Sequence, residues 1–172
     1  AKSVSCQAGF TRCSIFWPTF SSAELRLSQA KTTTSVTTTA TSTIGPASTI
    51  NLNLTNEAGA SITGALPVYF NQGEVINRGT ITSTKTGTGS AAAINGAENS
   101  TVRLEAGSVT SASSSTTGAA YAVNFTGAGN SIYIDTGATV NGSIRVATSG
   151  ATPNRVYLVG NGVQTLGSIV GF

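Results

Sequence analysis

The sequence predicts an all-β fold, a parallel β-helix whose short strands stack as repeated turns. Internal repetition is the first observation, because NSIYIDTGATVNGSI at residues 130–144 returns as NRVYLVGNGVQTLGSI at residues 154–169. The second is the alternation of apolar and polar residues in short runs, which places the apolar side chains on one face of a strand. The third is composition, since only 9% of residues are charged and Ser, Thr, Gly, Ala and Asn are abundant. A degenerate repeat of about 20 to 31 residues is typical of a solenoid, in which each unit buries its apolar face against the next.

Aligning the repeats predicts which residues lie one above another. The two C-terminal copies align Tyr133 with Tyr157, Ile134 with Leu158, Gly142 with Gly167, and Ile144 with Ile169. A third copy is NSTVRLEAGSVTS at 99–111, and AAAIN at 91–95 matches AYAVN at 120–124. Weaker copies lie at 50–64 and 74–83. We therefore expect parallel strands that pair with the equivalent strand of the neighbouring turn.

Glycine and asparagine punctuate the repeats. Gly107, Gly137 and Gly162 follow the strands where the backbone must turn, and glycine tolerates the positive φ that such turns often require. The irregular segments 85–92 and 111–120 are predicted to be loops that bulge from one side. Four asparagines begin N-x-S/T triplets: Asn53, Asn99, Asn124 and Asn141. We interpret the recurring asparagines as structural, with amides stacked in internal ladders.

Residues 1–47 differ in kind and are predicted to form a cap on the repeats of 48–172, within one domain. Cys6 and Cys13 are separated by six residues, which suits a structural disulfide in an oxidising compartment and not a redox CxxC motif. Four aromatic residues accompany this pair: Phe10, Phe16, Trp17 and Phe20. We expect a disulfide-stapled aromatic plug over the first turn. The absence of methionine suggests that a signal peptide was removed before Ala1.

Two segments of the predicted cap leave alternatives open. SSAELRLSQAK at 21–31 has Ser21 and Glu24 at capping-box spacing and is either a short helix, which we favour, or a strand with Leu25 and Leu27 inward. The threonine-rich stretch at 31–49 is either an edge strand, which we favour, or a mobile tether. For the whole chain, a two-sheet sandwich and a disordered linker are the competing interpretations. Neither requires neighbouring segments to resemble one another.

Most catalytic chemistry lacks its usual residues here. Histidine is absent, which removes the common base of nucleophilic triads and the commonest metal ligand. The acids are Asp135 and five glutamates, and although Glu105 and Asp135 are expected near each other, we interpret them as a solvated surface column. We predict no catalytic residue, no cofactor site and no metal site. The nine Lys and Arg residues are scattered, so nucleic-acid binding is not expected, and no apolar run approaches the length of a membrane-spanning helix.

The C-terminal repeats resemble a known class of proteins. ATVNGSIRV at 138–146 and NRVYLVGNGVQTLGSIVG at 154–171 resemble the passenger regions of classical monomeric autotransporters of Gram-negative bacteria, with their N-x-[IV]-x-[IL] and G-x-[IV] units. The resemblance covers residues 48–172. It implies a right-handed parallel β-helix, a piece of a longer passenger exported through a C-terminal barrel outside this sequence, and display at the cell surface or release. The protease branches of the family carry Ser, His and Asp motifs that this chain lacks.

The expected function is therefore binding and not catalysis. The first hypothesis is an adhesin or virulence factor that contacts a host cell-surface protein or glycan, or another copy of itself, through polar columns and the loops at 85–92 and 111–120. The second is a released effector that engages a host receptor or a complement regulator. The third is a structural spacer without a ligand. Ice binding is not favoured, because the threonine runs bunch at 32–43 and do not recur in each repeat.

Overall fold

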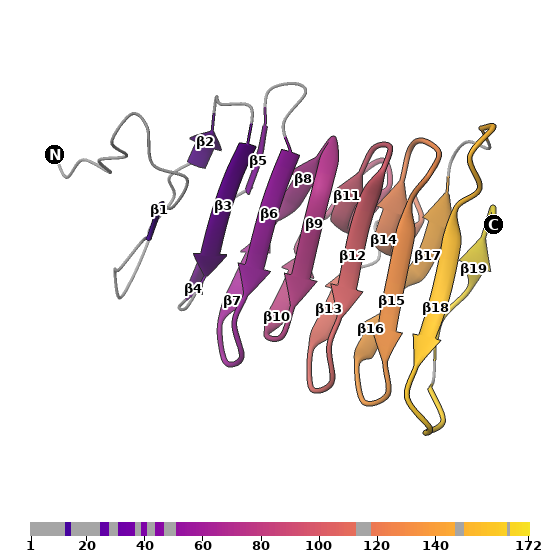
Figure 1. Cartoon of the computed structure of the whole chain (residues 1–172). Helices are drawn as coiled ribbons and strands as arrows, with labels where there is room; N and C mark the ends of the chain where they lie inside the picture. Colours follow the sequence, from indigo (N-terminus) through magenta and orange to yellow (C-terminus); the bar gives the residue numbers. More distant parts are fainter. Residues whose placement is uncertain are drawn as a thin grey trace, which may run out of the picture.

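The structure is a computed structural model of the whole chain (Figure 1). It describes residues 51–112, 118–146, 150–164 and 166–172 in full. Before residue 51 it describes only the backbone of five strands, within 13–46.

The described residues form strands that belong to three parallel sheets, which run along the length of the molecule (Figure 1). Sheet A, nearest the viewer, contains β1 (Cys13–Ser14), β3 (Lys31–Val36), β6 (Asn51–Asn56), β9 (Gln72–Asn77), β12 (Ser100–Leu104), β15 (Ser131–Asp135) and β18 (Arg155–Val159). Sheet C contains β4 (Thr39–Ala40), β7 (Ser61–Gly64), β10 (Thr80–Ser83), β13 (Val109–Ala112) and β16 (Thr139–Asn141). Sheet B contains β2 (Leu25–Leu27), β5 (Ile44–Pro46), β8 (Val68–Phe70), β11 (Ala91–Gly96), β14 (Ala120–Phe125), β17 (Ser143–Val146) and β19 (Ile169–Val170).

The chain visits the sheets in the order A, C, B and then returns to A, so each circuit is one turn of a β-solenoid. Four successive turns of three strands lie between Asn51 and Val146, and β18 and β19 begin a fifth. The predicted all-β parallel solenoid is confirmed. The competing two-sheet sandwich is wrong, because every strand pair is parallel and joins a segment to its counterpart in the next turn.

The register confirms the alignment of the repeats. Tyr133 pairs with Tyr157, Ile134 with Leu158, and Ile144 with Ile169. The segment 91–95 pairs with 120–124. Because matched segments lie side by side in parallel, sequence similarity between repeats becomes contact between like residues.

The core fills the space that the three sheets enclose. Inward side chains stack in columns, such as Leu54, Val75, Val102 and Ile132 beneath sheet A, and each is at most 1% exposed. Burial of one such side chain contributes roughly 1.5 to 3 kcal/mol. Phe70 and Phe125 are also fully buried and lie on either side of Gly96, where an added Cβ would lie 3.0 to 3.2 Å from the two rings. Glycine at position 96 therefore makes room for two inward phenylalanines on adjacent turns.

Asparagine ladders occupy the corners, but their members are not the four asparagines of the N-x-S/T triplets. Asn56 Nδ2 donates to Asn77 Oδ1 at 2.8 Å, and Asn77 Nδ2 donates to Thr110 Oγ1 at 2.9 Å, all inside the solenoid. At another corner, Asn130 Nδ2 donates to Asn154 Oδ1 at 3.0 Å. Buried amides require such partners, because an unpaired polar group costs about 1 to 3 kcal/mol. Each ladder therefore opposes a slip of one turn against the next.

The turn glycines follow the prediction at two of three places. Gly107 and Gly137 have φ values of 80° and 91°, in the left-handed region that glycine enters without strain. Gly162 does not have a positive φ; in the fifth turn that role falls to Gly160, with φ of 100°. An added Cβ at Gly162 would instead overlap Cγ2 of Thr136. This glycine is required by close approach of the neighbouring turn.

Parallel pairing extends to the N-terminal side of residue 48. β3 pairs with β6 along its whole length, β4 with β7, and β5 with β8. A strand in the threonine-rich stretch is thus confirmed for Lys31–Val36, but it is not the predicted edge strand, because β3 lies between β1 and β6. Within 21–31, Leu25–Leu27 is a strand that pairs with β5, as in the alternative that we favoured less. Cys6 and the cap aromatics lie outside the described residues and Cys13 is described only as a strand position, so the disulfide and the plug stay predictions.

Candidate functional site

The outer face of sheet A, defined here over β6, β9, β12, β15 and β18, carries most of the charged and aromatic side chains that the described residues expose. The strand register arranges its outward residues in three columns. Column 1 contains Asn53, Glu74, Thr101, Ser131 and Arg155. Column 2 contains Thr55, Ile76, Arg103, Tyr133 and Tyr157. Column 3 contains Glu57, Arg78 and Glu105, which directly follow β6, β9 and β12, and the paired residues Asp135 and Val159, which end β15 and β18.

A continuous stack runs from column 1 into column 2. Arg103 Nε donates to Glu74 Oε1 at 2.6 Å, and the guanidinium lies over the ring of Tyr133 at 4.3 Å from its centroid. Tyr133 in turn stacks on Tyr157, with centroids 4.5 Å apart and planes inclined by 10°. Glu74, and then the weaker fields of Tyr133 and Asp135, raise the pKa of Arg103, so this side chain stays charged. Each member holds its neighbour, so the stack presents a preorganised surface.

Three members of column 3 form an ion-pair network at the surface. Arg78 donates to Glu105 through Nε at 2.8 Å and through Nη2 at 3.3 Å, and to Glu57 through Nη1 at 3.1 Å. The hydrogen bonds to Glu105 and Glu57 raise the pKa of Arg78. The register that pairs Leu104 with Ile134 makes Glu105 and Asp135 neighbours, as expected. Glu105 is engaged by Arg78 at the surface, which agrees with a solvated column.

Two charged side chains on this face have no ion-pair partner within the described part of the chain. Arg155 is exposed in column 1 on β18, and Asp135 ends β15 in column 3. Their backbone groups are bonded, since Arg155 N donates to Asn130 O and Asp135 O accepts from Ala138 N. Their side-chain charges are therefore available to another molecule.

The outer face of sheet C is chemically different. Two outward columns cross four turns: Ser61, Thr80, Val109 and Thr139 form one, and Thr63, Thr82, Ser111 and Asn141 form the other. Six of these eight residues carry a hydroxyl and none is charged. Sequence reasoning did not predict these two columns. It missed them because the turns differ in length, so that only the strand register reveals the columns.

The outer face of sheet B and the adjoining loops present fewer candidate binding groups than the outer face of sheet A. Arg145 lies over the ring of Tyr121 at 5.2 Å, and Asn124 Nδ2 donates to Asn95 Oδ1 at 2.7 Å. The two predicted contact loops lie side by side. Gly118 is so close to Gly89 that an added Cβ would overlap the backbone of Gly89. Residues 113–117 lie outside the described residues, so a ligand site in these loops stays a prediction.

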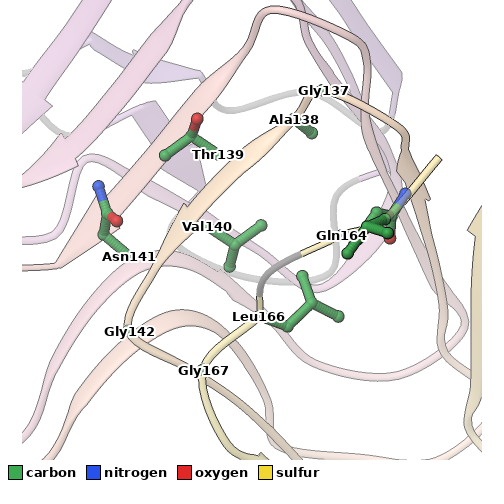
Figure 2. Close-up of a pocket in the computed structure, with 10 residues that line it drawn as sticks. Gly137, Ala138, Thr139, Val140, Asn141, Gly142, Gln164, Leu166 and Gly167 are labelled. Atoms are coloured by element: carbon green, nitrogen blue, oxygen red, sulfur yellow. The ribbon is translucent and has the colours of Figure 1, made fainter.

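A cavity of about 720 Å³ lies beside β16 in the last turns (Figure 2). Residues 137–142 form one wall, and Val163, Gln164, Leu166 and Gly167 form the other. Gln164 Nε2 donates to the carbonyl of Ile134 at 2.6 Å, whereas its Oε1 is buried without a partner. The lining holds no charged side chain, so the polar groups of the cavity are the hydroxyl of Thr139, the amides of Asn141 and Gln164, and the backbone.

Neither a cluster of metal ligands nor a membrane-spanning helix occurs among the described residues. No group of three acidic or cysteine side chains comes together there. Across the same residues, no helix has the length and apolar character that a bilayer crossing requires.

Compared with known protein families, with characterised proteins and with solved structures, the chain shows no significant match. The fold is therefore assigned from the strand register of this structure alone. The structure thus establishes a parallel β-solenoid, an architecture that autotransporter passengers share with other proteins.

Proposed function

We propose that this chain is a non-enzymatic binding module, part of the right-handed β-helical passenger of a Gram-negative autotransporter that is secreted or displayed at the bacterial surface. It acts as an adhesin that contacts a host cell-surface protein or glycan, or a second copy of itself. The solenoid fold and the resemblance of its repeats support the assignment. Right-handed winding is the rule for parallel strands joined by crossovers.

The stack of Glu74, Arg103, Tyr133 and Tyr157 is the observation that carries this proposal. Arg and Tyr are enriched at the energetic centres of interfaces, because they combine a large contact area with directed hydrogen bonds. Here both are half-exposed, and stacking already restricts their rotamers. A partner would therefore lose less side-chain entropy on binding than at a flexible surface.

Binding to cultured host cells tests the proposal. Labelled purified chain is applied to the cells beside Y133S/Y157S, which removes the stack, and T63A/T82A, which truncates two hydroxyls on the outer face of sheet C. We expect the first variant to lose at least about tenfold in apparent affinity and the second to bind like the wild type. Equal losses in both variants would contradict a role for the outer face of sheet A. Circular dichroism checks that both variants keep the β-sheet fold.

The same assay separates the alternatives. A released effector changes a cellular response when the soluble chain is added alone, whereas an adhesin only blocks bacterial attachment. A spacer tolerates removal of one whole turn without loss of attachment. An adhesin that uses the stack does not tolerate removal of the turn that contains Tyr133.

A further inference from the structure

We infer that the outer face of sheet A is a self-association surface, occupied by a second copy of this chain related by a two-fold axis. The inference rests on the proposed function, and it selects the partner among the three that the function allows. The two charged side chains left without partners carry it, since they have opposite signs and lie on opposite sides of the tyrosine pair.

The positions of these charges are symmetric about the tyrosines. Arg155 lies two residues before Tyr157 on β18, and Asp135 lies two residues after Tyr133 on β15. Each is thus about 7 Å from its tyrosine along the strand, in opposite directions. Because Tyr133 and Tyr157 are themselves neighbours across the two strands, the midpoint of the tyrosine pair is also the midpoint between Arg155 and Asp135.

A two-fold axis through this midpoint, in the plane of the interface and close to the long axis of the solenoid, makes the face complementary to itself. The strands of the two copies then run nearly antiparallel, and the crossing of about 30° that is usual for packed sheets brings the charges on adjacent turns into line. Arg155 of each copy meets Asp135 of the other. Such an isologous contact forms twice in each dimer.

The rest of the face agrees with this arrangement. Around the tyrosine pair, the rotation brings column 1 of one copy toward column 3 of the other. Column 2 faces itself, which stacks the tyrosines of the two copies. Arg103 also meets its own counterpart, but Glu74 at 2.6 Å compensates each of these charges. No acidic column lies over an acidic column.

The size of the face indicates a weak contact. Five strands span about 19 Å, and the three columns span about 13 Å along the strands. This corresponds to a few hundred Å² per copy, below the roughly 800 Å² of a standard stable interface. Weak contacts of this kind become effective when many copies are held on one surface, since the local concentration is high.

Charge reversal tests the inference with purified chain. Sedimentation velocity over a concentration series measures self-association of the wild type, R155E and D135R. Each single variant places like charges opposite each other twice, so we expect at least a tenfold weaker association. An equimolar mixture of the two variants restores both attractive contacts in the heterodimer, and association should return toward the wild-type level. A folding defect in either variant does not produce this rescue.

Three results would overturn the inference: a wild type that stays monomeric, single variants that associate like the wild type, or a mixture that fails to recover. T82K, which adds a charge to the outer face of sheet C, is the control and should not change association. The cell-binding assay with R155E and D135R keeps the two proposals distinct. If the wild type binds cells through the tyrosine stack but does not bind itself, self-association is wrong and the proposed binding function stands.

Discussion

The outer faces of sheets A and C differ in chemistry although they are built on the same scaffold. Both consist of parallel strands in register, and both cover an inner row of buried side chains, such as Ile132 beneath sheet A and Ile81 beneath sheet C. Outside, sheet A carries arginines, acids and stacked tyrosines, whereas sheet C carries small hydroxyl residues without charge. The inner rows hold the turns together, and the outward rows are free to vary. Differences in recognition are therefore expected to come from the outward rows.

The largest effect on stability is predicted for substitutions in the two inner rows, which are equally buried. Ile132→Ala and Ile81→Ala each remove a fully buried side chain from a tightly packed interior. We expect each to lower the free energy of unfolding by about 2 to 5 kcal/mol. Urea denaturation of both variants measures this. A cost below about 1 kcal/mol for only one of them would show that the two sheets do not share the core equally.

The corner between sheets A and C should respond less strongly. Asn77→Ala removes the amide that links Asn56 to Thr110, which leaves buried polar atoms without partners. The expected loss is about 1 to 3 kcal/mol in the free energy of unfolding. Thr82→Ala, on the outer face of sheet C, is the matched control and should change stability by less than about 0.5 kcal/mol. Similar values for the two variants would mean that the ladder does not stabilise the corner.

The smallest effect is expected from the ion pairs on the outer face of sheet A. Arg78→Gln removes the contacts with Glu57 and Glu105, which are exposed to solvent and screened by salt. We expect a slight decrease in melting temperature at low ionic strength that disappears at high ionic strength. A decrease that persists in high salt would indicate that packing of the arginine stem, and not its charge, holds column 3 to the sheet.

The repeats and their pairing could be predicted from the sequence wherever neighbouring turns use similar residues. Tyr133 and Tyr157 are identical, so their alignment predicted their stacking partners. The sequence did not predict the contact between Arg103 and Tyr133, because these paired residues do not resemble each other. The hydroxyl columns of sheet C were missed for the same reason, because turns of different length hide a register that backbone hydrogen bonds define.

The amino-acid sequence by itself determined the all-β class and the parallel stacking of repeats, because alternation, repetition and turn residues are local signals that each strand carries. Only the tertiary structure decided which unlike residues share a column: the Glu74, Arg103 and Tyr133 contacts, and the opposite placing of Arg155 and Asp135. These relations join residues 20 to 30 positions apart in the chain, and their separations depend on how many residues each turn uses between its strands.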